Sequence, residues 1–301
     1  MEPPQPRPTA QQGLLDLREW NFAQQGAVPL SGEWDFYWQQ LLQPGEPGIE
    51  PMTSTGIWDQ LQAQDGAALG AIGYGTFRLR VLLPAIDSLP ELALRVRGLM
   101  TAHRLWLGPA EVRGAGIVGS DLSQAVPATP NRIHVVRVDS DTLLINLQVA
   151  NPAFRMGGIR KPLQLGAADQ LLSFHTYQVI YDAVIFTLLL AAGLYFLLIF
   201  AARPKEMYRF FFGLLCTITA IRMTVAGEAL LIDILLPGVP WAVQIKTEYA
   251  ANFLGCMLVP GMITSFYQGQ SIKPWLSVIY AAALFLMVFA LLGPTNLVVQ
   301  T

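Results

Sequence analysis

Residues 183–202 read AVIFTLLLAAGLYFLLIFAA, twenty positions without a charged side chain. Basic residues follow directly, at Arg203, Lys205 and Arg209. A helix rises about 1.5 Å per residue, so twenty residues cover the roughly 30 Å hydrocarbon layer of a bilayer. Because no water is present there to satisfy the backbone of a lone strand or loop, the stretch predicts a membrane-spanning helix.

The same test, applied to the rest of the chain, predicts four spans, at 179–201, 208–227, 243–267 and 274–293. Each is predominantly apolar over enough residues to cross a bilayer. Proline and glycine residues interrupt the chain after the second span, and a polar stretch that contains glycine interrupts it after the third. The second half of the chain is therefore expected to form an α-helical multi-span membrane bundle.

The orientation of the bundle follows from its loops, because short loops that carry Lys and Arg stay in the cytoplasm. Arg203, Lys205 and Arg209 mark the first loop as cytoplasmic, whereas the second loop carries no cation. All residues before the first span should then lie outside the cytoplasm. The first thirteen residues lack the basic start and the apolar stretch of a signal peptide, so we expect the natural start to have been lost or removed.

Composition excludes several classes of protein. The formal net charge is −2 and no run of Lys or Arg occurs, which argues against nucleic-acid binding. Both cysteines, Cys216 and Cys256, fall in predicted spans, so the exported part has no disulfide available. The three histidines are far apart and lack partners at ligand spacing, so we expect no metal and no cofactor. No motif for enzymatic catalysis occurs.

The sequence of the exported part predicts β structure. Residues 1–13 are rich in Pro and Gln and are expected to be disordered. Within 14–170, apolar and other residues alternate at 77–83, 92–97 and 143–149, as in strands with one face toward a core. Glycine and proline separate these short strands. The fold class is therefore an all-β sandwich followed by the membrane helices.

Several stretches resemble a known family. Residues 30–38 (LSGEWDFYW), Trp58 and residues 75–79 (GTFRL) resemble a galactose-binding-like jelly roll, and residues 151–158 (NPAFRMGG) resemble its end before a first membrane helix. Further on, residues 222–227 and the stretch from Trp241 to Tyr249 are similar to the second and third helices of bacterial seven-transmembrane receptors with diverse intracellular signalling modules. The order of these stretches covers nearly the whole chain.

The resemblance implies a receptor of the bacterial inner membrane with a periplasmic ligand-sensing domain. Its ligand would be a small molecule, with a carbohydrate as one candidate. The helices would contact the lipid bilayer. Only four of the family's seven helices occur in the chain. The family further implies a cytoplasmic output domain, such as a kinase, cyclase or phosphatase, which we expect to be missing from this chain. A second copy of the chain, in a homodimer, is a further candidate partner.

Candidate ligand contacts lie on two kinds of side chain. Alternation puts Trp34, Phe36 and Trp38 on the core face of a strand and Tyr37 on the other face, where its ring can meet a ligand. Outward arginines on what would be adjacent strands form a second set, and a pair of them can hold a carboxylate or phosphate. This set is Arg78, Arg80, Arg95 and Arg97.

Ionisable residues inside the spans form a predicted intramembrane polar cluster of Arg222, Lys246, Glu248 and Asn252. A charge in the bilayer interior costs several kcal/mol unless it is paired or hydrated. Arg222 and Glu248 reach depths that allow contact, so we expect them to pair, either as a clamp between helices or as a switch. Lys246 is expected to reach outward toward the headgroups.

The sequence therefore favours the ligand-sensing region of a membrane signal-transduction receptor. Two other classes stay open. A transporter or channel fragment with an accessory sandwich would show broken helices and a polar path at mid-membrane. A membrane-tethered carbohydrate-binding or carbohydrate-active protein would need paired carboxylates in a cleft, if it were an enzyme.

Overall fold

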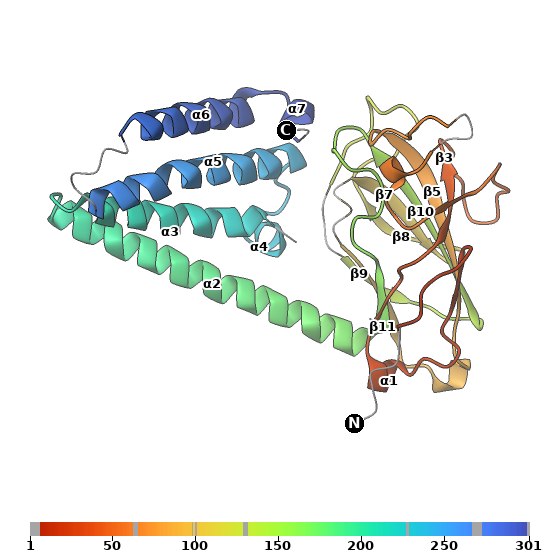
Figure 1. The fold of residues 1–301 in the computed structure, drawn as a ribbon. Coiled ribbons are helices and arrows are strands. Elements are labelled where there is room, and N and C mark those ends of the chain that lie inside the picture. The colour runs from red at the N-terminus through yellow and green to blue at the C-terminus, as the bar shows by residue number, and fades with distance from the viewer. Residues whose placement is uncertain are drawn as a thin grey trace. The chain divides into compact units, whose positions relative to one another are not determined.

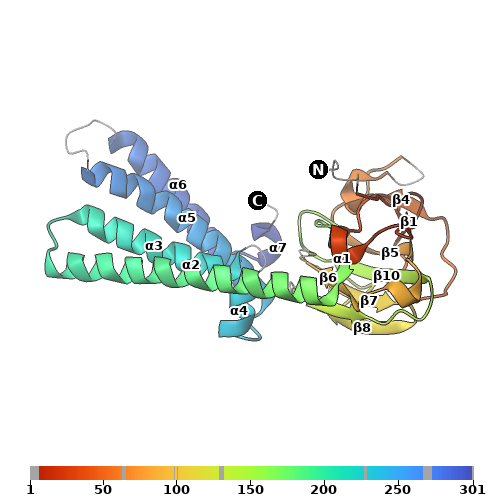
Figure 2. The same cartoon turned by 90° about the horizontal axis from the view of Figure 1, so that it is seen from below.

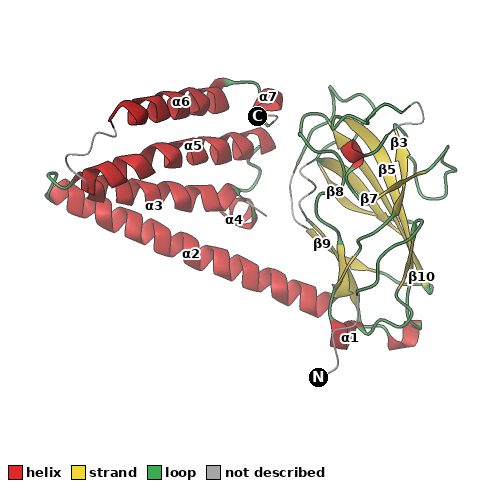
Figure 3. Cartoon of the chain, viewed as in Figure 1, coloured by secondary structure: helices red, strands yellow, loops and turns green. Residues whose placement is uncertain are grey.

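The structure is a computed structural model that describes residues 7–62, 66–97, 99, 101–128, 132–226, 229–266 and 273–299. These residues form two compact units, one ending at His175 and the other beginning at Thr176. Among the described residues, all strands precede Ala168 and all long helices follow from it (Figure 3). The predicted order of a β domain followed by helices is confirmed.

The larger sheet of the first unit has seven strands. From one edge to the other they are β4 (Met52–Ser54), β3 (Trp34–Trp38), β5 (Gly73–Leu82), β10 (Thr142–Asn151), β7 (Ala102–Leu107) and β8 (Ala110–Ala115). These neighbours run antiparallel, while β1 (Leu14–Asp16) pairs in parallel with the end of β5. Figure 1 labels five of the seven strands, β3, β5, β7, β8 and β10. The central strands β5, β10 and β7 are also seen next to one another in Figure 2.

The smaller sheet has four strands. Their order is β2 (Val28–Pro29), β11 (Gln164–Ala167), β6 (Leu92–Val96) and β9 (Arg132–Val136). The alternating stretches at 77–83, 92–97 and 143–149 correspond to β5, β6 and β10, so the sequence pattern located these strands correctly.

One apolar core lies between the two sheets. Leu79 and Leu147 of the larger sheet and Leu94 and Leu165 of the smaller sheet are fully buried and belong to the same cluster. Burial of apolar side chains from both sheets is what holds a sandwich together when no disulfide is present. The described structure is therefore a β-sandwich, as predicted.

Aromatic rings fill one part of this core. Trp34 and Phe36 are buried and Trp38 packs against the cluster, as the alternation along β3 predicted. The Phe36 ring centroid lies 4.5 Å from that of Phe77 and 5.6 Å from that of Trp58. Such pairs add to the stabilisation that burial alone provides.

The amino-terminal segment differs from the prediction of disorder over residues 1–13. Residues 1–6 lie outside the described part, but Ala10 is buried in the core. Its backbone N–H donates to Ser31 and its carbonyl accepts from Glu33. A small apolar side chain and backbone pairing with a neighbouring segment are enough to order this part of the chain, although it is rich in Pro and Gln.

Short helical turns of the sandwich were not predicted. They are the helix α1 (Phe22–Gln25) and two 3-10 turns at Trp58–Gln60 and Ile86–Ser88. The Asn21 side chain accepts hydrogen bonds from the backbone N–H groups of Ala23 and Gln24, which caps α1.

The helices of the remaining chain are α2 (Ala168–Ala202), α3 (Met207–Val225), α4 (Leu230–Leu235), α5 (Trp241–Phe266), α6 (Lys273–Leu292) and α7 (Thr295–Val298). By length and composition, α2, α3, α5 and α6 can each cross a membrane. They match the four predicted spans within a few residues, except at the start of α2. The predicted ends at Gly227 and Tyr267 lie outside the described residues.

Helix α2 begins eleven residues before the predicted span. Its first turns belong to the sandwich unit, where Ala168 and Leu171 are buried with Ala93 of β6. The sequence test searched for a membrane span and therefore missed this extension, which covers protein instead of lipid.

Helices α2 and α3 pack closely through glycine. A side chain on Gly193 would collide with Thr217 and the carbonyl of Gly213, and one on Gly213 would meet the backbone of Gly193. Small residues at this kind of contact let two helix backbones approach, which stabilises helix pairs in membranes. Beyond the glycines, the Phe196 ring of α2 lies 4.7 Å from the Phe212 ring of α3.

Candidate functional site

The outer face of the larger sheet, which points away from the core, carries polar side chains in rows across the strands. Asp35 of β3, Arg78 of β5 and Asn146 of β10 are direct neighbours in the strand register. The next row holds Arg80 of β5 between Leu14 of β1 and Leu144 of β10. Period-two alternation accounts for both rows, because the residues between them point into the core.

A loop lies over part of this face and is fixed to it by hydrogen bonds. We call residues 39–51, which join β3 to β4, the covering loop. The Leu42 carbonyl accepts from the side-chain amides of Asn146 and Gln148, at 2.9 and 3.1 Å. Thr76 Oγ1 donates to the Gln40 carbonyl and accepts from the Leu42 N–H, at 2.7 and 3.0 Å. The loop thus forms a fixed wall.

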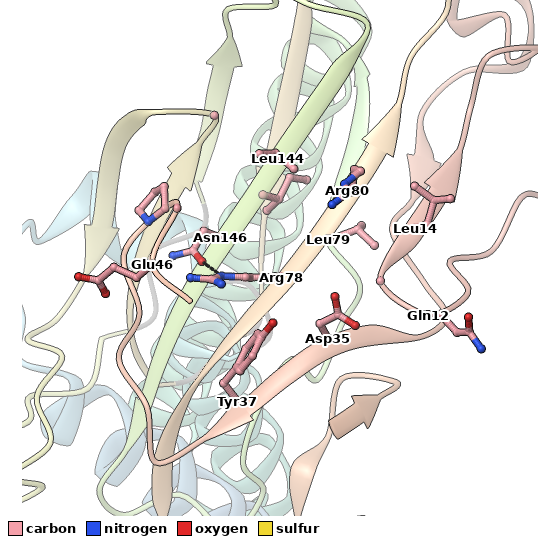
Figure 4. A pocket seen from close by; sticks show the side chains of 15 residues that line it. Gln12, Leu14, Asp35, Tyr37, Glu46, Arg78, Leu79, Arg80, Leu144 and Asn146 are labelled. Carbon is pink, nitrogen blue, oxygen red and sulfur yellow. Dashed lines mark hydrogen bonds between the residues drawn. The ribbon is translucent and has the colours of Figure 1, made fainter. Parts of the chain in front are cut away.

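We call the cavity that is lined by this wall and by residues 12–14 the sandwich pocket. It has a volume of about 460 Å³ (Figure 4). Its polar lining comes from β3, β5, β10, the covering loop and the segment before β1, as the labelled side chains show. These residues are Gln12, Asp35, Tyr37, Glu46, Arg78, Arg80 and Asn146. Leu14 and Leu144 add apolar surface to it.

Arg78 is the most tightly held side chain of the pocket. Its Nε donates to Asn146 Oδ1 at 2.8 Å, and its Nη2 donates to the Gln43 carbonyl of the covering loop at 2.8 Å. Its guanidinium also lies 5.1 Å from the centre of the Tyr37 ring. This cation–π contact and the two hydrogen bonds give the guanidinium one orientation.

Asp35 and Arg80 are held differently. Within the part of the chain that the structure describes, neither the Asp35 carboxylate nor the Arg80 guanidinium makes a side-chain hydrogen bond or an ion pair. The Asp35 carboxyl group packs against Gly13, whose φ of +72° favours glycine and which has no room for a side chain. Two opposite charges therefore stay available to a ligand.

The predicted ligand contacts divide into two groups. Tyr37, Arg78 and Arg80 line the sandwich pocket together, whereas Arg95 and Arg97 do not. The expectation that these arginines stand on adjacent strands is wrong, because β5 and β6 belong to different sheets.

Arg95 also departs from the expectation of a solvated outward arginine. It points away from the core, yet it is 0% exposed. The first turns of α2 lie on the outer face of the smaller sheet, and the Phe174 ring centre is 5.1 Å from the Arg95 guanidinium. Alternation predicted its direction correctly, and the unpredicted extension of α2 covers it.

Four further polar lining residues were not among the predicted contacts: Gln12, Asp35, Glu46 and Asn146. Alternation could have found Asp35, which shares the outer face of β3 with Tyr37, and it also places Asn146 on the outward face of β10. Their approach to Arg78 depends on strand register, and the position of Glu46 depends on the path of the covering loop. Neither is visible in the sequence pattern.

The interior of the sandwich holds an unusual histidine. His103 of β7 is 1% exposed, and burial lowers the pKa of its imidazole to about 4. A hydrogen bond with the Thr101 backbone raises this pKa, whereas the charges of His134 and Arg132 lower it further. The imidazole is therefore neutral at pH 7. Among the described residues, no group of three or more His, Cys, Asp or Glu side chains is arranged to hold a metal ion.

The predicted intramembrane cluster is not assembled as expected. In the described part of the chain, no salt bridge joins Arg222 to Glu248. Arg222 instead lines a second cavity, of about 590 Å³, with Tyr181 and Asp182 of α2. The sequence predicts compatible depths for Arg222 and Glu248, but depth does not determine which way a side chain points around the helix.

Lys246 and Asn252 are not among the residues that line the cavity of Arg222. Lys246 Nζ donates to the carbonyl of Leu291 in the last turn of α6, at 3.2 Å, where a cation complements the helix dipole. The expectation that Lys246 reaches toward the headgroups stays a prediction. Asn252 is exposed on α5.

Comparison with known families identifies the helical part of the chain. Residues 178–301 match the family model described as 7TM diverse intracellular signalling. The resemblance that the sequence suggested for this region is confirmed. No curated protein matches the chain.

Solved structures similar to the chain include three glycoside-processing enzymes. A β-glucuronidase from Ruminococcus gnavus, in complex with N1-substituted uronic isofagomine, is 10% identical with a TM-score of 0.33, and the match covers 46% of this chain and 29% of the enzyme. The Faecalibacterium prausnitzii β-glucuronidase is 14% identical, with a TM-score of 0.35 and coverages of 46% and 31%. A glycosyl hydrolase family 2 member from Bacteroides cellulosilyticus DSM 14838 is 12% identical, with a TM-score of 0.35 and coverages of 46% and 20%. The chain thus spans less than a third of each of these proteins.

Proposed function

We propose that the chain is the ligand-sensing region of a membrane receptor. The match of residues 178–301 to the 7TM diverse intracellular signalling family supports this proposal. In this proposal the sandwich pocket binds a small soluble molecule on the outer side of a bacterial inner membrane. Binding shifts the helical unit between two arrangements, which an output domain in the cytoplasm reads. The chain itself performs no chemistry on the ligand.

The observation that supports a ligand role is the construction of the sandwich pocket. Arg78 is held by Asn146 and by the covering loop, so a donor is already oriented before a ligand arrives. Oriented groups reduce the entropy that binding must overcome. A cavity of about 460 Å³ falls within the range of about 300–1,000 Å³ that is usual for small-molecule sites with a few convergent polar groups.

The external position of the sandwich rests on the cations between α2 and α3. The turn carries Arg203 and Lys205, and short loops that are rich in Lys and Arg stay on the cytoplasmic side. Labelling of introduced cysteines tests this topology, after Cys216 and Cys256 are replaced by serine. With a membrane-impermeant maleimide on intact spheroplasts, we expect Ser88→Cys to be labelled and Lys205→Cys to be labelled only after permeabilisation. The opposite pattern would contradict the external sandwich.

Ligand binding can be tested with the full chain in nanodiscs. The thermal unfolding of the sandwich is followed against a library of soluble metabolites and saccharides, and a true ligand raises Tm because it binds only the folded state. Leu144→Trp places an indole in the pocket, so we expect every true ligand to lose its effect. Ile117→Trp, at another exposed position, is the matched control. No stabilising compound, or one that is unaffected by Leu144→Trp, would contradict a sensing role for this pocket.

A further inference from the structure

The fold already uses several polar groups of the sandwich pocket. Asn146 accepts from Arg78 with Oδ1 and donates to the Leu42 carbonyl with Nδ2, so both ends of its amide are engaged. Arg78 lies against the Tyr37 ring, 5.1 Å from its centre. That face of the ring is therefore not open for stacking on a ligand. Recognition in this pocket depends on charged and hydroxyl groups more than on an aromatic platform.

The groups left for a ligand are a pair of guanidinium groups and a carboxylate. Arg80 is exposed and lies two residues after Arg78 on the same face of β5, which separates the two positions by about 7 Å. Arg78 engages its Nε and one Nη2 bond, so other N–H donors of its five stay free. Asp35, the direct neighbour of Arg78 on β3, offers oxygens that can only accept when ionised.

The apolar part of the lining lies beside Arg80. Leu14 and Leu144 flank it on the neighbouring strands and are 39% and 50% exposed. A ligand that covers them needs an apolar face, and one that reaches the charges needs polar groups around that face. A sugar ring has this distribution, with C–H groups on its faces and hydroxyl groups at its rim.

The charges then select among sugars and other small molecules. Two guanidinium groups bind a carboxylate more strongly than neutral hydroxyls, because ionised partners form shorter and stronger hydrogen bonds. Asp35 needs donors, which hydroxyl groups supply. A neutral sugar leaves the guanidinium pair with weak acceptors, and a simple organic acid brings no donors to Asp35. A free amino acid matches both charges, but apart from the aromatic ones it brings no flat apolar face to cover Leu14 and Leu144.

We propose that the sandwich pocket binds an acidic saccharide, with the sugar carboxylate on Arg80 and Arg78 and its hydroxyl groups on Asp35. This inference rests on the proposed sensing role of the same pocket and adds the chemical class of its ligand. Glu46 of the covering loop also lines the pocket, but its Oε2 already accepts from the Gln43 N–H at 2.8 Å, so the main acceptor for hydroxyl groups is Asp35. No covalent step is involved.

The test uses the full chain in nanodiscs and titration calorimetry. The probes are D-glucuronate, D-galacturonate and trigalacturonate, each compared with its neutral counterpart, D-glucose, D-galactose or a neutral galactose trisaccharide. We expect the acids to bind at least about 10-fold more tightly than the neutral sugars, and Arg80→Gln to weaken acid binding by about 10- to 100-fold. Asp35→Asn should weaken binding of acids as well, because it turns an acceptor-only group into an amide.

Arg104→Gln is the matched control for Arg80→Gln. Arg104 lies on the outer face of the same sheet and is exposed, but it pairs with Glu111 outside the pocket. Its substitution should leave acid binding unchanged. The Tm of each variant without ligand is measured first, and since the Arg80 side chain is exposed, Arg80→Gln should leave it close to that of the parent chain.

The outcomes separate this inference from the proposed function. Equal binding of neutral and acidic sugars, or acid binding that survives Arg80→Gln, would overturn the acidic class while leaving a ligand pocket in place. Failure of every probe would overturn the inference, and the library screen with Leu144→Trp would then decide the sensing role by itself. Release of monosaccharide from trigalacturonate would contradict a pocket that only binds.

Discussion

Two strands of the sandwich carry the same Arg-x-Arg pattern but have opposite surroundings. On β5, Arg78 and Arg80 face an open cavity beneath the covering loop. On β6, Arg95 is fully buried beneath the first turns of α2, and Arg97 follows just beyond the strand and is half-buried. Arg78, Arg80 and Arg95 all point away from the core, as alternation requires.

The difference between the two strands arises from what covers each sheet. The covering loop lies across one part of the larger sheet and leaves the row of Arg80 open. Helix α2 lies on the smaller sheet through Ala168 and Leu171 and closes it over Arg95. Local sequence therefore determines which way an arginine points, while a distant segment determines whether it can meet a ligand. The variants below separate these two contributions.

Arg95→Ala is expected to have the largest effect. Removal of a fully buried long side chain leaves a cavity and exposes groups that had packed against it, so the free energy of unfolding of the sandwich should fall by about 3–4 kcal/mol. The measurement is urea unfolding of the full chain in nanodiscs, followed by tryptophan fluorescence.

The matched variant is Arg80→Ala, in which an exposed arginine of the same pattern is removed. Its effect on unfolding should stay within about 0.5 kcal/mol, as for most surface substitutions. Equal losses for the two variants would show that the cover over β6 does not distinguish them.

The pH dependence of stability tests a second buried position, His103 on the inner face of the larger sheet. The folded pKa of His103 is about 4 and its ordinary value is 6.5, so below pH 6.5 the unfolded chain binds more protons than the folded chain. Stability that is fully present above pH 6.5 should be lost as the pH falls toward 4, by about 3 kcal/mol in total at about 1.4 kcal/mol per pH unit.

Urea unfolding at several pH values between 7 and 4 measures this loss, with His103→Gln as the reference. The variant lacks the titrating imidazole, so its stability should change less over the same range. The remaining slope reports other groups, among them His134, whose pKa is lowered by its own partial burial and by Arg132. Parallel slopes for the two chains would assign the acid sensitivity elsewhere.

Much of the fold could be predicted from the sequence because its signals are local. Unbroken apolar length identified the spans, and period-two alternation identified β5, β6 and β10 together with the core positions of Trp34 and Phe36. Length and alternation reflect bilayer thickness and strand geometry, which act residue by residue.

The candidate site was only partly predictable, because it depends on contacts between distant segments. Tyr37, Arg78 and Arg80 were identified by their direction, but alternation cannot assign strands to sheets, so Arg95 was grouped with them wrongly. Asn146 reaches Arg78 across 68 residues of sequence. Within the membrane, the depth of Arg222 was estimated from sequence, whereas its direction around α3 was not.

Phe174→Leu examines the cover of Arg95 directly. Leucine keeps the apolar bulk above β6 but removes the ring whose centre lies 5.1 Å from the guanidinium. A desolvated cation–π contact is worth about 1–2 kcal/mol, so we expect unfolding to become easier by about 1 kcal/mol. In the Arg95→Ala background the same substitution should have almost no effect, because the contact is already absent. Additive losses in this double-mutant cycle would contradict a direct contact between the two side chains.

Arg104→Gln should also have a small effect, because it tests an arginine that has partners but little cover. Arg104 Nε and Nη2 donate to the two carboxylate oxygens of Glu111, at 3.0 and 3.2 Å, and the guanidinium lies 5.2 Å from the Trp106 ring centre. Both charged side chains are nearly half exposed. Solvent screens such a pair, so urea unfolding should change by no more than about 0.5–1 kcal/mol, and less at high salt. If Arg104→Gln cost as much as Arg95→Ala, hydrogen-bond partners would account for the contrast between the arginines and burial beneath α2 would not.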